Sequence, residues 1–148
     1  MIGKWIRMLY LIVAWLFLVA ILFQVFLVGL SLFTTQSYWD AHIGFGHSIV
    51  FLPALQVLLA YLGQIPPPAK LLTWLSLGIC LIQTEVFAMI RTAVPTLAAL
   101  HPVLALVLFA LALTIAWRAR TVVQAKIQTP STSQDRPSME EKGSLAPD

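Results

Sequence analysis

The chain has 148 residues, of which 59% are hydrophobic and only 10% are charged. Soluble domains usually carry about 25% charged residues, and a domain of this size exposes too much surface to hide so much apolar area from water. The composition therefore excludes an ordinary soluble domain and predicts a protein dissolved in lipid. The net charge of +3 comes from scattered basic residues, which does not favour binding to nucleic acid.

The first half of the chain contains two long apolar segments. The first is predicted to span the membrane over residues 9–33, because about 20 helical residues cross the hydrocarbon. A cleaved signal peptide would have a shorter apolar region of about 7–15 residues. The second span is predicted over residues 41–62, where we expect Asp40 to cap the first turn and Pro53 to kink the helix.

The second half of the chain contains two further apolar segments. Three consecutive prolines at residues 66–68 cannot continue a helix and favour an extended connector. A third span is predicted over residues 71–90, interrupted by the polar residues 83–85. A fourth span is predicted over residues 96–117, with Pro95 in its first turn.

The composition changes near residue 126, where the chain becomes polar and rich in proline and serine. Such sequence cannot bury enough apolar area to fold, so residues 126–148 are predicted to be a disordered tail. Residues 1–125 are predicted to form one all-α membrane domain with four transmembrane helices. The connections are short, which makes consecutive helices antiparallel neighbours in an up-down-up-down bundle.

Basic residues predict the orientation of this bundle. Only Arg91 falls on one side of the four predicted spans, and six basic residues fall on the other side. Basic loops favour the cytoplasm, so we expect a multi-pass protein of the bacterial inner membrane with both termini cytoplasmic. The six residues are Lys4, Arg7, Lys70, Arg118, Arg120 and Lys126.

All three histidines lie near the predicted outer ends of two spans. His42 and His47 lie near the start of the second span, and His101 lies near the start of the fourth. At 1.5 Å per residue, either His42 or His47 could stand opposite His101. Two neutral imidazoles on facing helices are the usual ligands of a b-type haem, and Gly46, one turn after His42, would leave room for the porphyrin.

The histidines also have a plainer interpretation, because a histidine at the end of a membrane helix is commonly hydrogen-bonded to headgroups or water. The sequence contains no CxxCH motif, which excludes covalent c-type haem on motif grounds. Three histidines without a carboxylate cluster argue against a structural zinc or di-iron site. The two interpretations stay open at this point.

Two charged residues accompany the histidines. Glu85 is predicted to lie roughly 9 Å inside the outer end of the third span, and intramembrane carboxylates usually face the bundle interior or are paired. Glu85 could orient a histidine or relay protons, or it could snorkel outward or pair with Arg91. Arg91 could bind haem propionates or lipid phosphates, or it could be an ordinary interfacial arginine.

Several short strings of the sequence resemble a known family of small bacterial four-helix membrane proteins. That family is catalogued as a domain of unknown function, DUF6220, and the resemblance covers about residues 9–118. The strings are the run from Gln24 through Gly29 to Phe33, then Ala41-His42-x-x-x-Gly46, then Gln83, then Leu100-His101-Pro102-Val103.

The DUF6220 family is similar in layout to one half of haem A synthase, a four-helix unit with a histidine near the outer end of its second and fourth helices. This resemblance implies that His42 and His101 are the matched pair, with His47 as an extra. The usual basic residue after the first histidine is Ile43 here. The usual acidic residue before it is matched only approximately, by Asp40.

Two functions follow from the sequence. The first is a membrane protein of unassigned role that holds one b-type haem between its second and fourth helices, for electron transfer or haem handling. The alternative is a cofactor-free accessory or assembly subunit of a larger respiratory or photosynthetic complex. A transporter fits less well, because transporters are expected to carry more charged residues within the membrane and to have discontinuous helices in paired positions.

A stand-alone enzyme is the least favoured class, because the sequence contains no nucleophile–base arrangement or phosphate loop, and no catalytic residue is predicted. The expected partners are the lipid bilayer, other membrane subunits or a second copy of the chain.

Overall fold

The computed structural model describes residues 2–125. Within this range the regular elements are all helices, which confirms the all-α class predicted from composition. Four helical segments are long and apolar enough to cross a membrane, as predicted. The predicted disordered tail, residues 126–148, lies outside the described residues. The four segments are Ile2–Phe33, Ser37–Leu62, Pro67–Ile90 and Pro95–Thr121.

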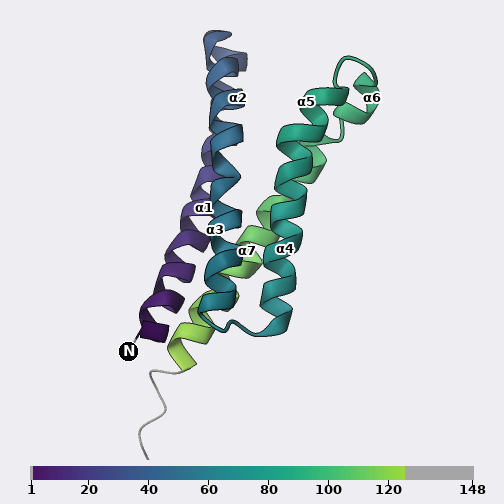
Figure 1. Cartoon of the computed structure of the whole chain (residues 1–148). Helices are drawn as coiled ribbons and strands as arrows, with labels where there is room; N and C mark the ends of the chain where they lie inside the picture. Colours follow the sequence, from purple (N-terminus) through teal and green to yellow (C-terminus); the bar gives the residue numbers. More distant parts are fainter. Residues whose placement is uncertain (1, 126–148) are drawn as a thin grey trace, which may run out of the picture.

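The first segment is one continuous helix, α1 (Ile2–Phe33). The second segment consists of two helices, α2 (Ser37–Ile49) and α3 (Phe51–Leu62), which follow one another in nearly the same direction (Figure 1). Their junction lies just before Pro53, which has no N–H to donate to the carbonyl four residues earlier. The helix is therefore interrupted just before Pro53, where a kink was predicted, but α2 and α3 keep nearly the same direction.

Asp40 does not cap α2, contrary to the sequence-based expectation. The helix already begins at Ser37, and Gln36 before it has helical backbone angles (φ −60°, ψ −20°). Asp40 therefore lies inside the first turn of α2. Its carboxylate can still interact favourably with the positive end of the helix dipole from that position.

The triple proline is only partly the extended connector that was predicted. Pro66 is extended (φ −57°, ψ 147°), but Pro67 and Pro68 form the first turn of helix α4 (Pro67–Leu81). Residues in a first turn need no backbone N–H donor, and the φ of proline is already helical. The same residue type that ends a helix therefore starts one here.

The polar interruption in the third segment is a π-helix, η1 (Ile82–Val86), which leads into the short helix α5 (Phe87–Ile90). The backbone N–H of Phe87 donates to the carbonyl of Ile82, five residues earlier. One such turn inside an α-helix accommodates one extra residue, and such turns are frequent at functional sites.

The fourth segment is not the single helix predicted from residue 96. It consists of a short helix, α6 (Pro95–Ala98), a turn, and the long helix α7 (His101–Ala125). Pro102 explains the break, because its ring cannot donate to the carbonyl of Ala98 and would clash with it. The long helix therefore restarts at His101, with Pro102 in its first turn, and runs beyond the predicted end at residue 117.

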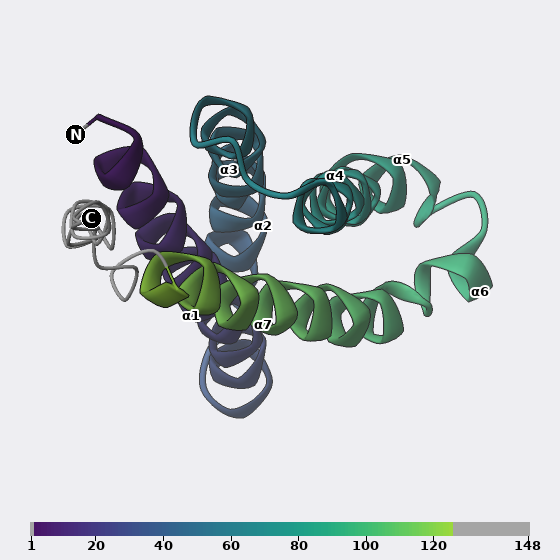
Figure 2. The ribbon, with the colours of Figure 1, turned by 90° about the horizontal axis from the view of Figure 1, so that it is seen from below.

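The helices form the predicted up-down-up-down bundle. α1 packs against α2, α3 and α7, and α4 packs against α3 and α7. α1 runs beside and across α2–α3, and α4–α5 lies in front of α7 in the view of Figure 1 (Figures 1 and 2). At one end of the bundle, the α1–α2 connection and the α5–α6 connection diverge (Figures 1 and 2).

We call the diverging end the histidine end, because it contains the three histidines. The opposite end contains the start of α1, the α3–α4 connection and the last turns of α7, and we call it the basic end. Here the guanidinium Nε of Arg7 donates to the carbonyl of Gly63 at 2.8 Å, and the ammonium of Lys70 lies 4.7 Å from the ring centre of Tyr61. The basic residues of this end within the described range are Lys4, Arg7, Lys70, Arg118 and Arg120.

Candidate functional site

The histidine end brings together the two histidines that the family resemblance implied as a pair. His42 lies in the second turn of α2, and His101 is the first residue of α7. Their ring centres are 6.2 Å apart, with the ring planes at 74°. Both rings are half-buried. Segments far apart in the sequence thus place two imidazoles side by side.

A backbone carbonyl of α1 fixes the orientation of His42. Its Nδ1 lies 3.2 Å from the carbonyl oxygen of Gln24. Because a carbonyl oxygen can only accept a hydrogen bond, Nδ1 carries the proton and donates it. The Nε2 atom then keeps its lone pair. Histidines that bind metals commonly show this arrangement, in which one nitrogen donates to a carbonyl and the other is a ligand.

Two aromatic side chains flank the histidine pair. Trp39, one turn before His42 on α2, stacks on the His42 ring at 5.2 Å between centres. Phe87, the first residue of α5, meets the His101 ring edge to face at 5.6 Å. Sequence analysis missed Phe87, because it lies in an apolar run that gives no sign of which face it presents. Its contact ties α5 to the start of α7.

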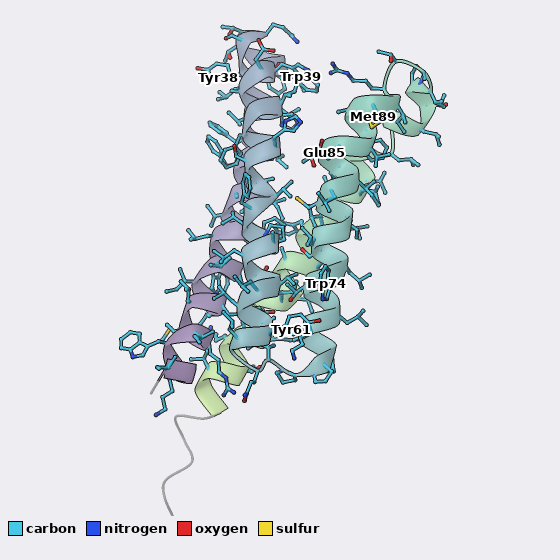
Figure 3. The ribbon with its side chains drawn as sticks, viewed as in Figure 1. Tyr38, Trp39, Tyr61, Trp74, Glu85 and Met89 are labelled. Atoms are coloured by element: carbon cyan, nitrogen blue, oxygen red, sulfur yellow. The ribbon has the colours of Figure 1, made fainter. Side chains whose placement is uncertain are left out.

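His47 and Glu85 form a second pair, between α2 and η1. The Nε2 of His47 lies 3.9 Å from a carboxylate oxygen of Glu85, and its Nδ1 donates to the carbonyl of Ile43 at 2.9 Å. Figure 3 shows Glu85 reaching from η1 toward α2. His47 therefore contacts Glu85, whereas His42 contacts His101. The predicted role of Glu85 as a proton relay or as a support for a ligand stays a prediction.

The other two predicted site residues lie beside this arrangement. Gly46 is buried and faces α1, where an added Cβ would lie 2.8 Å from the side-chain nitrogen of Gln24. The space that its missing side chain leaves is thus taken by Gln24, so this contact supports close helix packing. Arg91 directly follows α5 at the histidine end and is exposed. Its role toward propionates or phosphates stays a prediction.

The donor set at this end limits what it could hold. In residues 2–125, no group of three or more His, Cys, Asp or Glu side chains is close enough together to hold a metal ion. Two histidines alone leave most coordination positions of an iron or zinc ion empty. A two-histidine site therefore suits a group that brings its own equatorial ligands, as a porphyrin does.

Comparison with known proteins adds a partial match to one family and no activity. The model of a family described as "Family of unknown function (DUF6220)" matches residues 24–90. The match confirms the resemblance over this stretch, which contains His42, Gly46, His47 and Glu85 and ends before His101. No curated protein and no solved structure matches the chain.

Proposed function

Because the match over residues 24–90 is to a family of unknown function, we propose a function from the histidine end itself. We propose that this four-helix membrane protein binds one b-type haem between His42 and His101, for electron transfer or haem handling. The observation that carries the proposal is the 6.2 Å separation of the two imidazole rings.

The separation fits the geometry of two histidines that share one metal ion. A metal–nitrogen bond to histidine is about 2.0 Å long, and the ring centre lies about 1 Å behind the bonding nitrogen. Ring centres 6.2 Å apart are therefore close enough for both imidazoles to hold one metal ion between them. The free Nε2 of His42, whose Nδ1 donates to Gln24, also fits a ligand role.

When bound, haem would supply one-electron redox chemistry. The residues of this chain would bind and orient it. His42 and His101 would hold the iron, and the carbonyl of Gln24 would keep the proton of His42 on Nδ1. Trp39 and Phe87 would limit the access of water to the two imidazoles. The layout shared with one half of haem A synthase stays a prediction.

We further propose that the basic end faces the bacterial cytoplasm. The supporting observation is that Lys4, Arg7 and Lys70 lie at one end together with the basic residues of α7, whereas Arg91 lies at the other. Short basic loops are retained on the cytoplasmic side. A cysteine introduced at Gln64 should then be labelled by an impermeant maleimide only after the cells are opened.

The test of haem binding is an absorption spectrum of the full chain purified in detergent, oxidised and then reduced with dithionite. We expect a Soret band with sharp reduced α and β bands. His42→Ala and His101→Ala should each remove them, and His47→Ala, the matched control on α2, should retain them. A colourless protein that also takes up no added hemin would refute the proposal.

One observation favours the cofactor-free alternative, an accessory subunit of a larger membrane complex. The ring of His101 already packs against His42 and against Phe87, so the histidines join α2, α5 and α7 without any cofactor. On this alternative, His42→Ala and His101→Ala would lower the stability of the bundle, would change no visible spectrum, and would leave assembly with a partner intact.

A further inference from the structure

The pair of His47 and Glu85 is exposed within two helical segments that are long and apolar enough to cross a membrane. Their side chains are 49% and 55% exposed. His47 lies ten residues after the start of α2 at Ser37, which is about 15 Å along the helix. Polar groups at such depth are costly in contact with lipid and normally face protein or a water-filled cavity. Something other than lipid is therefore expected to cover the pair.

The chemistry of the pair indicates what kind of surface would cover it. Nδ1 of His47 donates its proton to the carbonyl of Ile43, so Nε2 can face the Glu85 oxygen favourably only when a further proton lies between the two groups. The pair then holds one acid and one base in a single patch. Such a patch is complementary to itself, as the surface of a two-fold symmetric dimer must be.

The helix faces around the pair are suited to close approach. On α2, Gly44 and Ser48 are exposed and one turn apart, and an added Cβ at Gly44 would meet nothing within 4 Å. Small residues at this spacing let membrane helices pack tightly. We call the surface the α2–η1 face; it consists of Gly44, His47, Ser48 and Phe51 on α2–α3, and of Gly78, Ile82, Glu85 and Met89 on α4–α5, all exposed.

We propose that the α2–η1 face is the docking surface for a second copy of this chain. In a two-fold dimer, His47 of each copy can meet Glu85 of the other, so all four groups are covered and the charges balance. A different subunit that carries only one sign of charge would leave either His47 or Glu85 without a partner of opposite charge. Lipid would leave both side chains without a polar partner. The proposal does not depend on haem.

Cysteine cross-linking in native membranes tests this surface directly. The only native cysteine, Cys80, is first replaced by alanine, and Gly44, Ser48 and Phe51 are then changed to cysteine one at a time. The matched control is Leu22→Cys, which is exposed on α1 and lies about 200° around the helix from Gln24, the residue that contacts α2. Leu22 lies at a similar depth along the bundle as the tested positions, because Gln24, two residues away on α1, contacts Gly46 on α2.

We expect at least one position of the α2–η1 face to form a disulfide-linked dimer about fivefold more than the control does, as close helix packing at small residues requires. Equal cross-linking at all positions would overturn the proposal. The proposal would also be overturned if the purified full-length chain had the mass of a monomer in mild detergent and if the fluorescently labelled chain bleached in a single step in vesicles.

Exchanging the two charged residues gives the sharper test. His47→Glu alone and Glu85→His alone should each shift the protein to monomers, because each places like groups across the two-fold axis. The double variant His47→Glu/Glu85→His should restore the dimer. Circular dichroism shows whether each variant still folds. Dimers that persist in all three variants would overturn the role of the pair.

Discussion

The two ends of the bundle are held together in different ways. At the basic end, the interior is a continuous cluster of apolar side chains contributed by α1, α3, α4 and α7. At the histidine end, the contacts across the diverging helices are polar or aromatic. In residues 22–48 and 81–107 the buried residues are only Leu27, Ser31, Gly46, Gln83 and Phe87.

This difference indicates that the stability of the fold resides in the basic end and in the middle of the bundle. Small residues allow close packing there: Ala14, Ala60 and Ala116 are almost fully buried at helix contacts. Membrane helices gain stability mainly from such packing. The residues of the histidine end then contribute little to the stability of the fold and can serve binding instead. The following experiments test this division, from the largest expected effect to the smallest.

Overpacking should separate the two ends most clearly. Ala116→Leu inserts a larger side chain at a position that is 0% exposed in the basic-end cluster, and we expect it to lower the free energy of unfolding by about 1–3 kcal/mol. Ala88→Leu, the matched change at an exposed position of the histidine end, should leave it unchanged. Unfolding in mixed detergent micelles measures both, and equal losses would contradict the division.

Gln56→Leu should stabilise the protein. The side chain of Gln56 is fully buried, and within the described part of the chain neither its amide oxygen nor its amide nitrogen has a hydrogen-bond partner. A buried polar atom without a partner costs about 1–3 kcal/mol, so we expect the free energy of unfolding to rise by about 1 kcal/mol. The exposed change Gln36→Leu is the control. A loss of stability would show that Gln56 has a partner, such as a buried water.

The hydrogen bond between Tyr10 and Thr73 should contribute a smaller amount. Their hydroxyl oxygens are 2.9 Å apart, and Thr73 donates its proton to the carbonyl of Ala69, which makes Tyr10 the donor in the pair. A double-mutant cycle with Tyr10→Phe and Thr73→Val should give a coupling of about 0.6 kcal/mol, typical of bonds between membrane helices. Additive losses would show that the bond contributes nothing.

The smallest effect is expected in α6. Leu97 is about half exposed on this short helix at the histidine end, outside both apolar clusters. Leu97→Ala should change the free energy of unfolding by less than about 0.5 kcal/mol, as is usual for surface positions. A loss above 1 kcal/mol, measured in the same micelle titration, would place α6 in the stable part of the bundle.

Sequence reasoning reached the fold class, the four segments and the order of the helices, because long apolar runs and short connections determine them. It left His42 and His47 open as the partner of His101, because all three lie near the start of spans that begin on the same side, and the resemblance to DUF6220 proteins implied His42. It was wrong about Asp40 and partly wrong about the prolines. A proline can end a helix or begin one, and neighbouring residues decide which, so Pro67 and Pro102 each lie in the first turn of a helix.

Other features of the site leave little trace in a sequence. His42 is oriented by the main-chain carbonyl of Gln24. Every residue has such a carbonyl, so the residue type at position 24 could not predict this contact. The contact of Phe87 with His101 depends on how far η1 rotates the helix before α5. A helical pattern with a fixed period of 3.6 residues cannot reproduce that rotation.

The π-helical turn has a consequence for how relatives of this chain should be aligned. Because η1 accommodates one residue more than an α-helical turn, a relative that lacks one residue between Leu81 and Phe87 could form an uninterrupted α-helix with the rest of the segment in the same orientation. The counterpart of Phe87 would then still face the counterpart of His101, although it would lie one residue earlier in the sequence. An alignment with such a relative should therefore place the single gap within residues 82–86.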